Sequence, residues 1–343
     1  MSNRLSRKIF ERCATSRLGQ RCLSAYLSQG RRIRNHLPAS LRPLSDRIYG
    51  GHLHALVRLQ AKREQYFATF FLRNRPELEL MRRLIDQKAS GSTIKVSVLA
   101  CSKGAEVYSM TWILRSARPD LKLSMYAVDI SQEIVDFAEK GVYSLSNSDA
   151  LDTEAAKEKG DVSRYTSRDQ NAWIFERVSK DEIDAMFDVK DKQASIKSEF
   201  KEGITWLCRD AGDTRLRAEI GLQDIIVANR FLCHMKPEAA EACLRNIAKM
   251  IRPGGYLFVS GIDLDVRTRV ALEMGWQPMP DLLREIHDGD DSIRRGWPLE
   301  YWGLEPLNDR REDWQTRYAS VFQVGENVPC ESLKLASAEC AGR

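Results

Sequence analysis

The sequence lacks the features that mark several classes of protein. Its 343 residues contain no run of 18 consecutive apolar residues, so a transmembrane helix is not expected. The opening residues, MSNRLSRKIFERC, contain no apolar signal-peptide core, which favours a cytoplasmic protein over a secreted one. None of the eight cysteines forms C-x-x-C, and the five histidines do not form H-E-x-x-H. We therefore expect reduced thiols, no disulfide framework and no metal site.

Acidic residues are scarce in the first part of the chain. Residues 1–63 contain fourteen Lys or Arg but only Glu11 and Asp46, a formal charge of +12, whereas the whole chain carries +5. The simplest expectation is a basic, solvated helical arm over residues 1–63. Such an arm also fits an acidic partner or an anionic membrane surface, and its Ser-rich, acid-poor composition fits a mitochondrial transit peptide. We do not expect nucleic acid as the partner.

From Ile94 onward, segments typical of strands alternate with segments typical of helices. This alternation predicts an α/β fold with a doubly wound, mostly parallel, Rossmann-like sheet. We expect strands in IKVSVLA, LKLSMYAVDI, ITWLC, QDIIVAN, YLFVSG and RYASVFQV, and an amphipathic helix in KPEAAEACLRNIAKMI closed by RPGG. Residues 64–343 would form this domain, with a polar insert at 142–203 and a Trp-containing tail at 263–343.

Three candidate binding segments follow predicted strands, where open parallel sheets bind their ligands. The first is the turn from Ala100 to Glu106, whose small residues let a ligand approach the backbone. The second is Asp129, which ends the second strand, where an acidic residue accepts hydrogen bonds from ribose hydroxyls. The third is Asn229 and Arg230, followed by His234. The chain has neither G-x-G-x-x-G nor G-x-x-x-x-G-K-S/T, which disfavours a pyrophosphate or triphosphate ligand.

The order of these segments resembles the CheR-type chemotaxis receptor methyltransferases, which use S-adenosylmethionine. That family reads T-x-F-F-R, A-A-S-x-G-E-E-P-Y-S, A-T-D-I, a polar N-L, C-R-N-V-x-I-Y-F and L-x-P-G-G-x-L-F. This chain reads TFFLR at 69–73, ACSKGAEVYS at 100–109, AVDI at 127–130, RDA at 209–211, ANRFLCHM at 228–235 and IRPGGYLF at 251–258. The resemblance covers about residues 66–262, and all six segments occur in the family's order.

The resemblance implies a role for each matching residue. Glu106 would hold the amino group of the cofactor's methionine part, Asp129 the ribose hydroxyls, and Asp210 with Ala211 the adenine. Ala100 and Cys101 would line the cofactor, Thr69 and Arg73 would face its methyl group, and Asn229 and Arg230 would lie beside the reaction centre.

Beyond the matching segments, Asp263 and Asp265 would contact the acceptor or cap a helix, and Trp297, Tyr301 and Trp302 would wall an acceptor pocket or form core.

The departures from the family pattern leave the methyl acceptor open. The family's C-R-N is Ala228-Asn229-Arg230 here, and His234 stands where the family has tyrosine. A carboxylate acceptor is anionic near pH 7 and needs only orientation, which Arg73 would supply as in-line methyl transfer requires. A hydroxyl on a glycan or small molecule must lose a proton, for which His234 is a candidate base, unless it merely packs. The remaining alternative is a non-catalytic cofactor-binding module.

Overall fold

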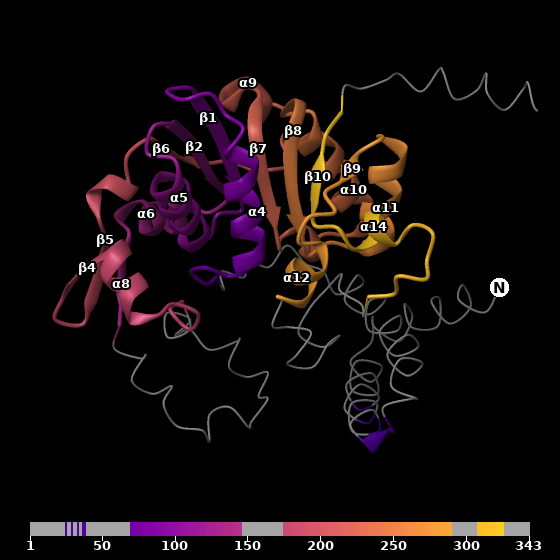
Figure 1. The fold of residues 1–343 in the computed structure, drawn as a ribbon, viewed down its shortest axis with the longest axis horizontal. Coiled ribbons are helices and arrows are strands. Elements are labelled where there is room, and N and C mark those ends of the chain that lie inside the picture. Colours follow the sequence, from indigo (N-terminus) through magenta and orange to yellow (C-terminus); the bar gives the residue numbers. More distant parts are fainter. Residues whose placement is uncertain are drawn as a thin grey trace, which may run out of the picture.

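The computed structural model describes residues 69–145, 174–289 and 307–325, together with residues 25, 29, 33 and 36–38. The expectations for the basic arm at 1–63, and for Trp297, Tyr301 and Trp302, therefore concern residues outside this description. In the described part a large twisted sheet has helices on both faces (Figure 1). None of the described helices is long and apolar enough to cross a lipid bilayer.

Seven strands form the large sheet, in the order β6-β2-β1-β7-β8-β10-β9. The strands are β1 (Thr93–Leu99), β2 (Lys122–Asp129), β6 (Ile204–Cys208), β7 (Gln223–Asn229), β8 (Ile251–Ser260), β9 (Gln277–Pro278) and β10 (Val321–Gln323). The first five run parallel, whereas β10 is antiparallel to both β8 and β9. This arrangement confirms the predicted doubly wound, mostly parallel α/β sheet. The chain returns from the edge strand β6 to β7 beside β1, so the sheet has a switch point between β1 and β7.

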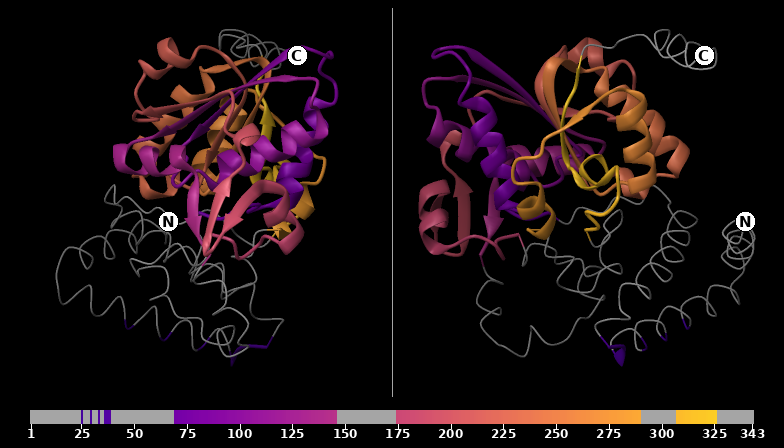
Figure 2. Two further views of the ribbon diagram at one scale, coloured as in Figure 1. Left: turned by 90° about the vertical axis from the view of Figure 1, so that its left-hand side faces the viewer. Right: turned by 45° about the vertical axis from the view of Figure 1, so that its right-hand side comes forward.

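The central strands are buried on both faces, as expected for parallel strands covered by helices. All seven residues of β7 are buried; Ile225 and Val227 pack on one face, and Ile226 and Ala228 on the other. One face carries α4 (Arg75–Ile85), α5 (Ala105–Ala117) and α12 (Leu283–Asp288). The other carries α9 (Leu216–Ile220), α10 (Pro237–Ala248) and α11 (Leu264–Glu273), with α14 (Trp314–Tyr318) beside α11 (Figure 2). The sheet is thus the middle of three layers.

The expected polar insert at 142–203 contains a second sheet in its described part. Its elements are β3 (Val142–Ser144), α8 (Lys180–Met186), β4 (Phe187–Lys190), β5 (Gln193–Ile196) and η3 (Ser198–Phe200), and the three antiparallel strands have the order β3-β5-β4. Buried aromatic rings form its core, among them Tyr143, Phe175 and Phe187. These few rings are spread among charged residues in the sequence and come together only in the fold. The sheet follows α6 (Gln132–Lys140), and its core packs against α5.

Two element boundaries differ from the sequence expectations. The RPGG segment belongs to β8, because backbone hydrogen bonding continues on its N-terminal side beyond Tyr256. The amide of Gly254 donates to the carbonyl of Val324, the residue after β10, at 2.8 Å. A left-handed φ of 73° at Gly254 makes this continuation possible. The segment RYASVFQV is only partly a strand, since Arg317 and Tyr318 end α14 and β10 begins at Val321.

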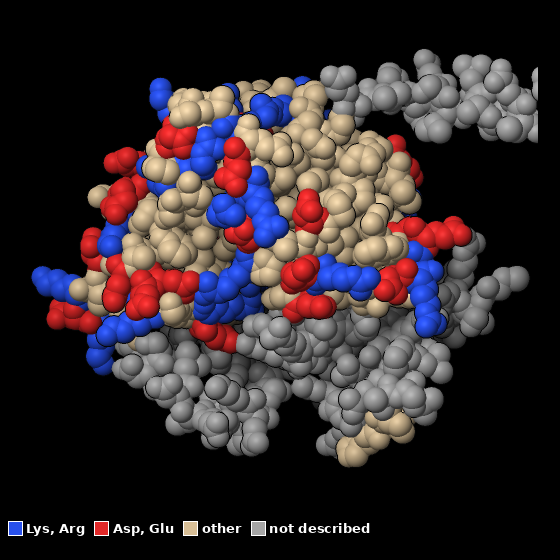
Figure 3. Space-filling model, viewed as in Figure 1, with Lys and Arg blue, Asp and Glu red and all other residues tan. Residues whose placement is uncertain are grey.

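Charges of both signs interleave on the described surface. Figure 3 shows basic and acidic residues alternating over the face that carries α4. On that helix Glu79 pairs with Arg82 at 2.7 Å and with Arg83 at 2.9 Å. Exposed ion pairs of this kind contribute little to the free energy of unfolding. The one-sided positive charge of the sequence therefore belongs to residues 1–63 and not to this face.

Candidate functional site

A strained turn joins β1 to α5. Ala100 and Ser102 both have left-handed φ angles, of 55° and 50°, which are unusual for residues other than glycine. Gly104 follows with φ 83°, and a Cβ there would lie 3.1–3.2 Å from Ala138, Trp206 and Tyr108. Backbone strain of this kind gathers at ligand-binding sites. We call residues 100–106 the cofactor turn, because they are the segment for which the sequence predicts that role.

Asp129 lies at the end of β2, directly beside the cofactor turn. Its carboxylate accepts hydrogen bonds from the amides of Ser102, at 2.8 Å, and Ser131, at 3.3 Å. The residue is only 5% exposed, and burial raises the pKa of its carboxyl group despite these bonds. Ser131 occupies the N-cap position of α6, but its side chain makes no capping hydrogen bond. A carboxylate has about four acceptor positions, so Asp129 can still accept hydrogen bonds from a ligand.

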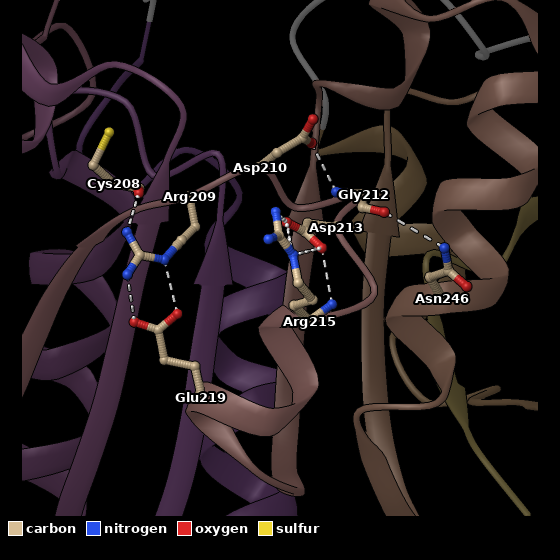
Figure 4. Close-up of polar contacts among 8 residues, drawn as sticks. All are labelled: Cys208, Arg209, Asp210, Gly212, Asp213, Arg215, Glu219 and Asn246. Carbon is tan, nitrogen blue, oxygen red and sulfur yellow. Dashed lines mark hydrogen bonds and ion pairs between the residues drawn. The ribbon is translucent and has the colours of Figure 1, made fainter.

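The loop after β6 carries the predicted adenine-side residues (Figure 4). The carboxylate of Asp210 accepts from the amide of Gly212 at 2.8 Å, which fixes a tight turn, and Ala211 is buried. Arg209 is tied to the end of β2, because its amide donates to the Asp129 carbonyl at 2.8 Å. The sheet thus brings Asp129 and the Asp210 turn to one edge.

Asn229, the last residue of β7, connects two glutamates. Its Nδ2 group donates to Glu77 on α4 at 2.8 Å and to Glu106 of the cofactor turn at 3.0 Å. Its Oδ1 atom accepts from the hydroxyl of Ser260, at the end of β8, at 2.7 Å. Asn229 is only 6% exposed, so one amide side chain joins β7, β8, α4 and α5 inside the protein.

The segment that carries Arg73 is held from both sides. Phe71 is fully buried among the rings of the small sheet, with Phe187 at 5.0 Å and Phe175 at 5.3 Å between centroids. Leu72 has a left-handed φ of 52°, and its amide donates to the hydroxyl of Ser109 on α5 at 2.9 Å. Asn74 then caps α4 and also donates to the Ile286 carbonyl at 2.9 Å. These contacts fix the backbone on each side of Arg73.

A polar pocket opens next to Asn229. It encloses about 550 Å³, including its open mouth, and its described lining residues are Arg73, Asn74, Glu77, Asn229, Arg230, Ser260, Gly261, Leu264, Arg267, Ile286, His287, Tyr318 and Ser320. One wall is the start of α4 with the ends of β7 and β8. The rest of the lining, which we call the tail wall, comes from α11, α12 and the residues before β10, and its α12 part lies next to α4. Through Asn229 this pocket adjoins the cofactor turn.

The structure divides the predicted site residues into two neighbouring groups. The first group lies in the cofactor turn or next to it and consists of Ala100, Cys101, Glu106, Asp129, Asp210 and Ala211. Arg73, Asn229 and Arg230 line the polar pocket, and Thr69 is buried four residues before Arg73. The left-handed φ of 63° at Arg230 marks a strained turn after β7.

His234 and the tail aspartates lie elsewhere. His234 ends η4 (Leu232–His234), burial lowers the pKa of its imidazole, and it is not among the residues that line the polar pocket. Asp263 caps α11 by accepting from the amide of Asp265 at 2.9 Å, in agreement with the capping alternative. Asp265 pairs with Arg317 at 2.9 Å.

Sequence reasoning missed most of the polar pocket. Glu77 was overlooked because it stands three residues after the cap Asn74, a spacing typical of ordinary helix capping. Arg267, His287, Tyr318 and Ser320 lie in the tail, where no motif points to a site. The one usable signal was that charged residues are interspersed among the apolar residues of α11. One of them, Arg267, is buried in the fold.

Comparisons with known protein families agree with this geometry. Residues 68–164 match the family model described as "CheR methyltransferase, SAM binding domain", which covers the cofactor turn and Asp129. Residues 176–259 match a second model, described as "Methyltransferase domain". The chain carries a divergent CheR-like methyltransferase domain, whose cofactor is S-adenosylmethionine.

Individual relatives of this CheR-like domain are distant. An uncharacterized 104.1 kDa protein of Rhodobacter capsulatus is 26% identical over 247 residues, which is 68% of this chain and 21% of that protein. The chain thus spans about a fifth of that relative's length. Among solved structures, the N-methyltransferase NodS of Bradyrhizobium japonicum with S-adenosyl-L-homocysteine is 16% identical, covering 56% of this chain and 63% of NodS, at a TM-score of 0.28. Magnesium protoporphyrin IX methyltransferase of Synechocystis, with bound cofactor, is 13% identical over 59% and 68% of the two chains, at 0.31.

The residues of the CheR-like domain fit the chemistry of its cofactor. S-adenosylmethionine offers an ammonium group and two ribose hydroxyls as hydrogen-bond donors, and the site offers the carboxylates of Glu106 and Asp129 as acceptors. The strained turn has small residues at Ala100, Ser102 and Gly104, so a ligand can approach its backbone.

Proposed function

We propose that the protein methylates a carboxylate oxygen of its acceptor, forming a methyl ester, and that the acceptor carboxylate enters the polar pocket. S-adenosylmethionine supplies an electrophilic methyl group on a sulfonium. The chain's own residues then have to hold the acceptor in line with it, and such alignment lowers a barrier by about 7–11 kcal/mol. Glu106 and Asp129 hold the cofactor in this proposal, and Arg73 with Arg230 orients the acceptor.

One observation carries the proposal: the polar pocket and the cofactor turn share Asn229. The amide of Asn229 bonds Glu106 on the cofactor side and lines the pocket on the other side. The pocket contains the arginines Arg73 and Arg230, whose guanidinium groups suit bidentate binding of a carboxylate. A carboxylate is already a nucleophile at neutral pH, so this reaction needs no base among the lining residues.

A hydroxyl acceptor with His234 as its base is the competing hypothesis. The lowered pKa of His234 favours the neutral imidazole that a base requires. Its position outside the pocket lining argues against it. The imidazole among the lining residues is that of His287, which lies 3.2 Å from Asp288.

The chemical stability of the product distinguishes these acceptors. We would incubate the full-length protein with radiolabelled S-adenosylmethionine and a panel of receptor fragments, glycans and small acids. A methyl ester releases volatile labelled methanol in mild alkali, whereas a methyl ether on a hydroxyl keeps its label. Alkali-labile label supports the proposal. Alkali-stable label contradicts it, and the absence of transfer to any acceptor would favour a non-catalytic binding module.

Arg73 provides the matching variant test. Replacing Arg73 by Ala should lower kcat/KM for the acceptor by at least about a hundredfold, because a charged hydrogen-bonding partner of the acceptor is lost. The dissociation constant of S-adenosylhomocysteine should change by less than about threefold. Arg75→Ala is the control, since Arg75 is exposed and pairs with Glu182 at 2.5 Å on the surface. Equal effects of the two variants would remove Arg73 from the proposed role.

A further inference from the structure

The tail wall of the polar pocket contains a buried cation without an ion-pair partner. Arg267, on α11, is 4% exposed and lines the pocket. Its Nη1 atom donates to the Val259 carbonyl at 3.0 Å, and its Nη2 atom donates to the Arg317 carbonyl at 2.8 Å. Its Nε atom has no hydrogen-bond partner in the described part of the chain. Within that part, no carboxylate lies within ion-pair distance of Arg267.

The electrostatic setting of Arg267 is unusual for this protein. Burial and the nearby charge of Arg317 lower the pKa of Arg267 to about 9, against the opposing effect of the Glu77 charge, so the group is still charged at neutral pH. By contrast, the buried carboxylate of Asp224 has two ion-pair partners, Lys88 at 2.6 Å and Arg252 at 2.7 Å. A buried charge without an ion-pair partner in direct contact is costly, and a bound anion would lower that cost.

A second unsatisfied donor lies in the same wall. The hydroxyl of Ser320, just before β10, is buried, lines the pocket and has no hydrogen-bond partner among the described residues. A hydroxyl and a guanidinium N–H together complement a carboxylate, which accepts up to about four hydrogen bonds. The main chain joins the two residues to one strand, because the amide of Val259 donates to the Ser320 carbonyl at 2.7 Å and Arg267 donates to the Val259 carbonyl.

We propose that Arg267 and Ser320 form the floor of the polar pocket and select the acceptor by its negative charge. The inference deepens the proposed function and rests on it for the identity of the pocket as the acceptor site. The ligand class is a carboxylate. Arg267 is a specificity-determining residue here: it binds the acceptor carboxylate from the tail wall, together with Arg73 and Arg230, which line the pocket next to the cofactor turn. Both floor residues lie beyond residue 259, where the match to the methyltransferase family models ends.

The test uses a charged probe and its neutral isostere. The full-length protein, saturated with S-adenosylhomocysteine, is titrated with propionate and with propionamide, and binding is followed by NMR. The wild type should bind propionate at least about tenfold more tightly than propionamide, because charge-assisted hydrogen bonds are the stronger ones. Arg267→Met should reduce that preference several-fold, because only Arg73 and Arg230 then remain to bind the charge, and Ser320→Ala should weaken propionate binding a few-fold. A wild type that does not distinguish the two probes overturns the inference.

Two further variants make the result specific. Arg269→Met is the matched control: Arg269 lies on the same helix but pairs with Glu241 at the surface, so the probe preference should be unchanged. Arg267→Lys keeps the charge and tests the role if Arg267→Met fails to fold; it should retain part of the preference. Two outcomes would contradict the assignment. One is propionate binding in Arg267→Met as tight as in the wild type; the other is propionate binding in Arg267→Lys as weak as in Arg267→Met.

This experiment separates the inference from the proposed function. Binding of the probes requires no methyl transfer. If Arg267 governs the preference for propionate while only alkali-stable label forms in the transfer assay, the anion floor stands and the ester-forming reaction fails. If labile ester forms but Arg267→Met keeps the wild-type preference, the reaction stands and the inference fails.

Discussion

At the scale of single residues, Asp129 combines burial with an expected ligand contact. Burial raises the pKa of its carboxyl group, although two backbone amides donate to it. A raised pKa in the folded state means that deprotonation costs stability as the pH rises through that pKa. Ligand donors that bind the carboxylate would offset this cost.

The raised pKa of Asp129 predicts a pH-dependent cofactor affinity. The affinity for S-adenosylhomocysteine should fall as the pH is lowered from 7 to 4, because the protonated carboxyl group is the weaker acceptor. Calorimetric titrations across this range measure the effect. Asp129→Asn should bind about 1–3 kcal/mol more weakly at pH 7 and should lack the acid limb. An unchanged wild-type affinity down to pH 4 would argue against a contact with Asp129.

Gly104 is the glycine of the cofactor turn, and an added side chain there would be crowded. Gly104→Ala should destabilise the protein by about 1–2 kcal/mol for the left-handed conformation and by about 1–3 kcal/mol more for crowding against Ala138, Trp206 and Tyr108. Gly91→Ala is the control, because Gly91 has φ 74° and nothing within 4 Å of its added Cβ. Urea denaturation should therefore show a smaller loss for Gly91→Ala; equal losses would mean that crowding contributes nothing.

At the scale of elements, four of them meet at one amide. Asn229 places a neutral donor between the carboxylates of Glu77 and Glu106 and so lets α4 and α5 approach the end of β7. An aspartate at this position would turn two hydrogen bonds into two repulsions. Its own pKa would be raised by its neighbours, so the folded state would be favoured only while it is protonated.

Asn229→Asp should therefore lose stability as the pH rises. We expect a loss of about 3 kcal/mol at pH 7.5 and a smaller loss at pH 5, because the added carboxyl group is protonated more readily between its neighbours. Asn229→Ala removes the donor without adding charge, so its deficit should be similar at both pH values. Denaturation curves at the two pH values decide the matter, and parallel deficits for the two variants would speak against repulsion.

Elements were predictable from the sequence where one local rule determines them. β1, β2, β6 and β7 follow from apolar runs, and the end of α6 at Gly141 follows from a glycine with φ 60°. The places of Asp129 and Glu106 in the fold also follow from local rules, since Asp129 ends β2 and Glu106 lies in the first turn of α5; their cofactor roles stay predictions. The tail wall of the polar pocket could not be predicted in this way, because Arg267, His287 and Ser320 come together only when β10 inserts between β8 and β9.

At the scale of the whole molecule, the basic arm is separate in sequence from every predicted cofactor residue. Thr69 is the first of them, and residues 1–63 carry the excess positive charge. A chain starting at Gly51 should therefore bind S-adenosylhomocysteine within about threefold of the full-length affinity. Calorimetry on the two chains tests this. A much larger loss would show that the arm contributes to the cofactor site.

The split between the pocket walls has a consequence for the order of synthesis. Every residue of the cofactor turn, together with Asp129 and Asn229, leaves the ribosome before any residue of the tail wall. Chains fold as they emerge, from the amino-terminal side onward. The last described strand, β10, lies directly after Ser320 and joins the sheet between β8 and β9. With the roles proposed above, a growing chain has its cofactor contacts available before it can hold an acceptor, and the last described strand to be made is the one that completes the pocket.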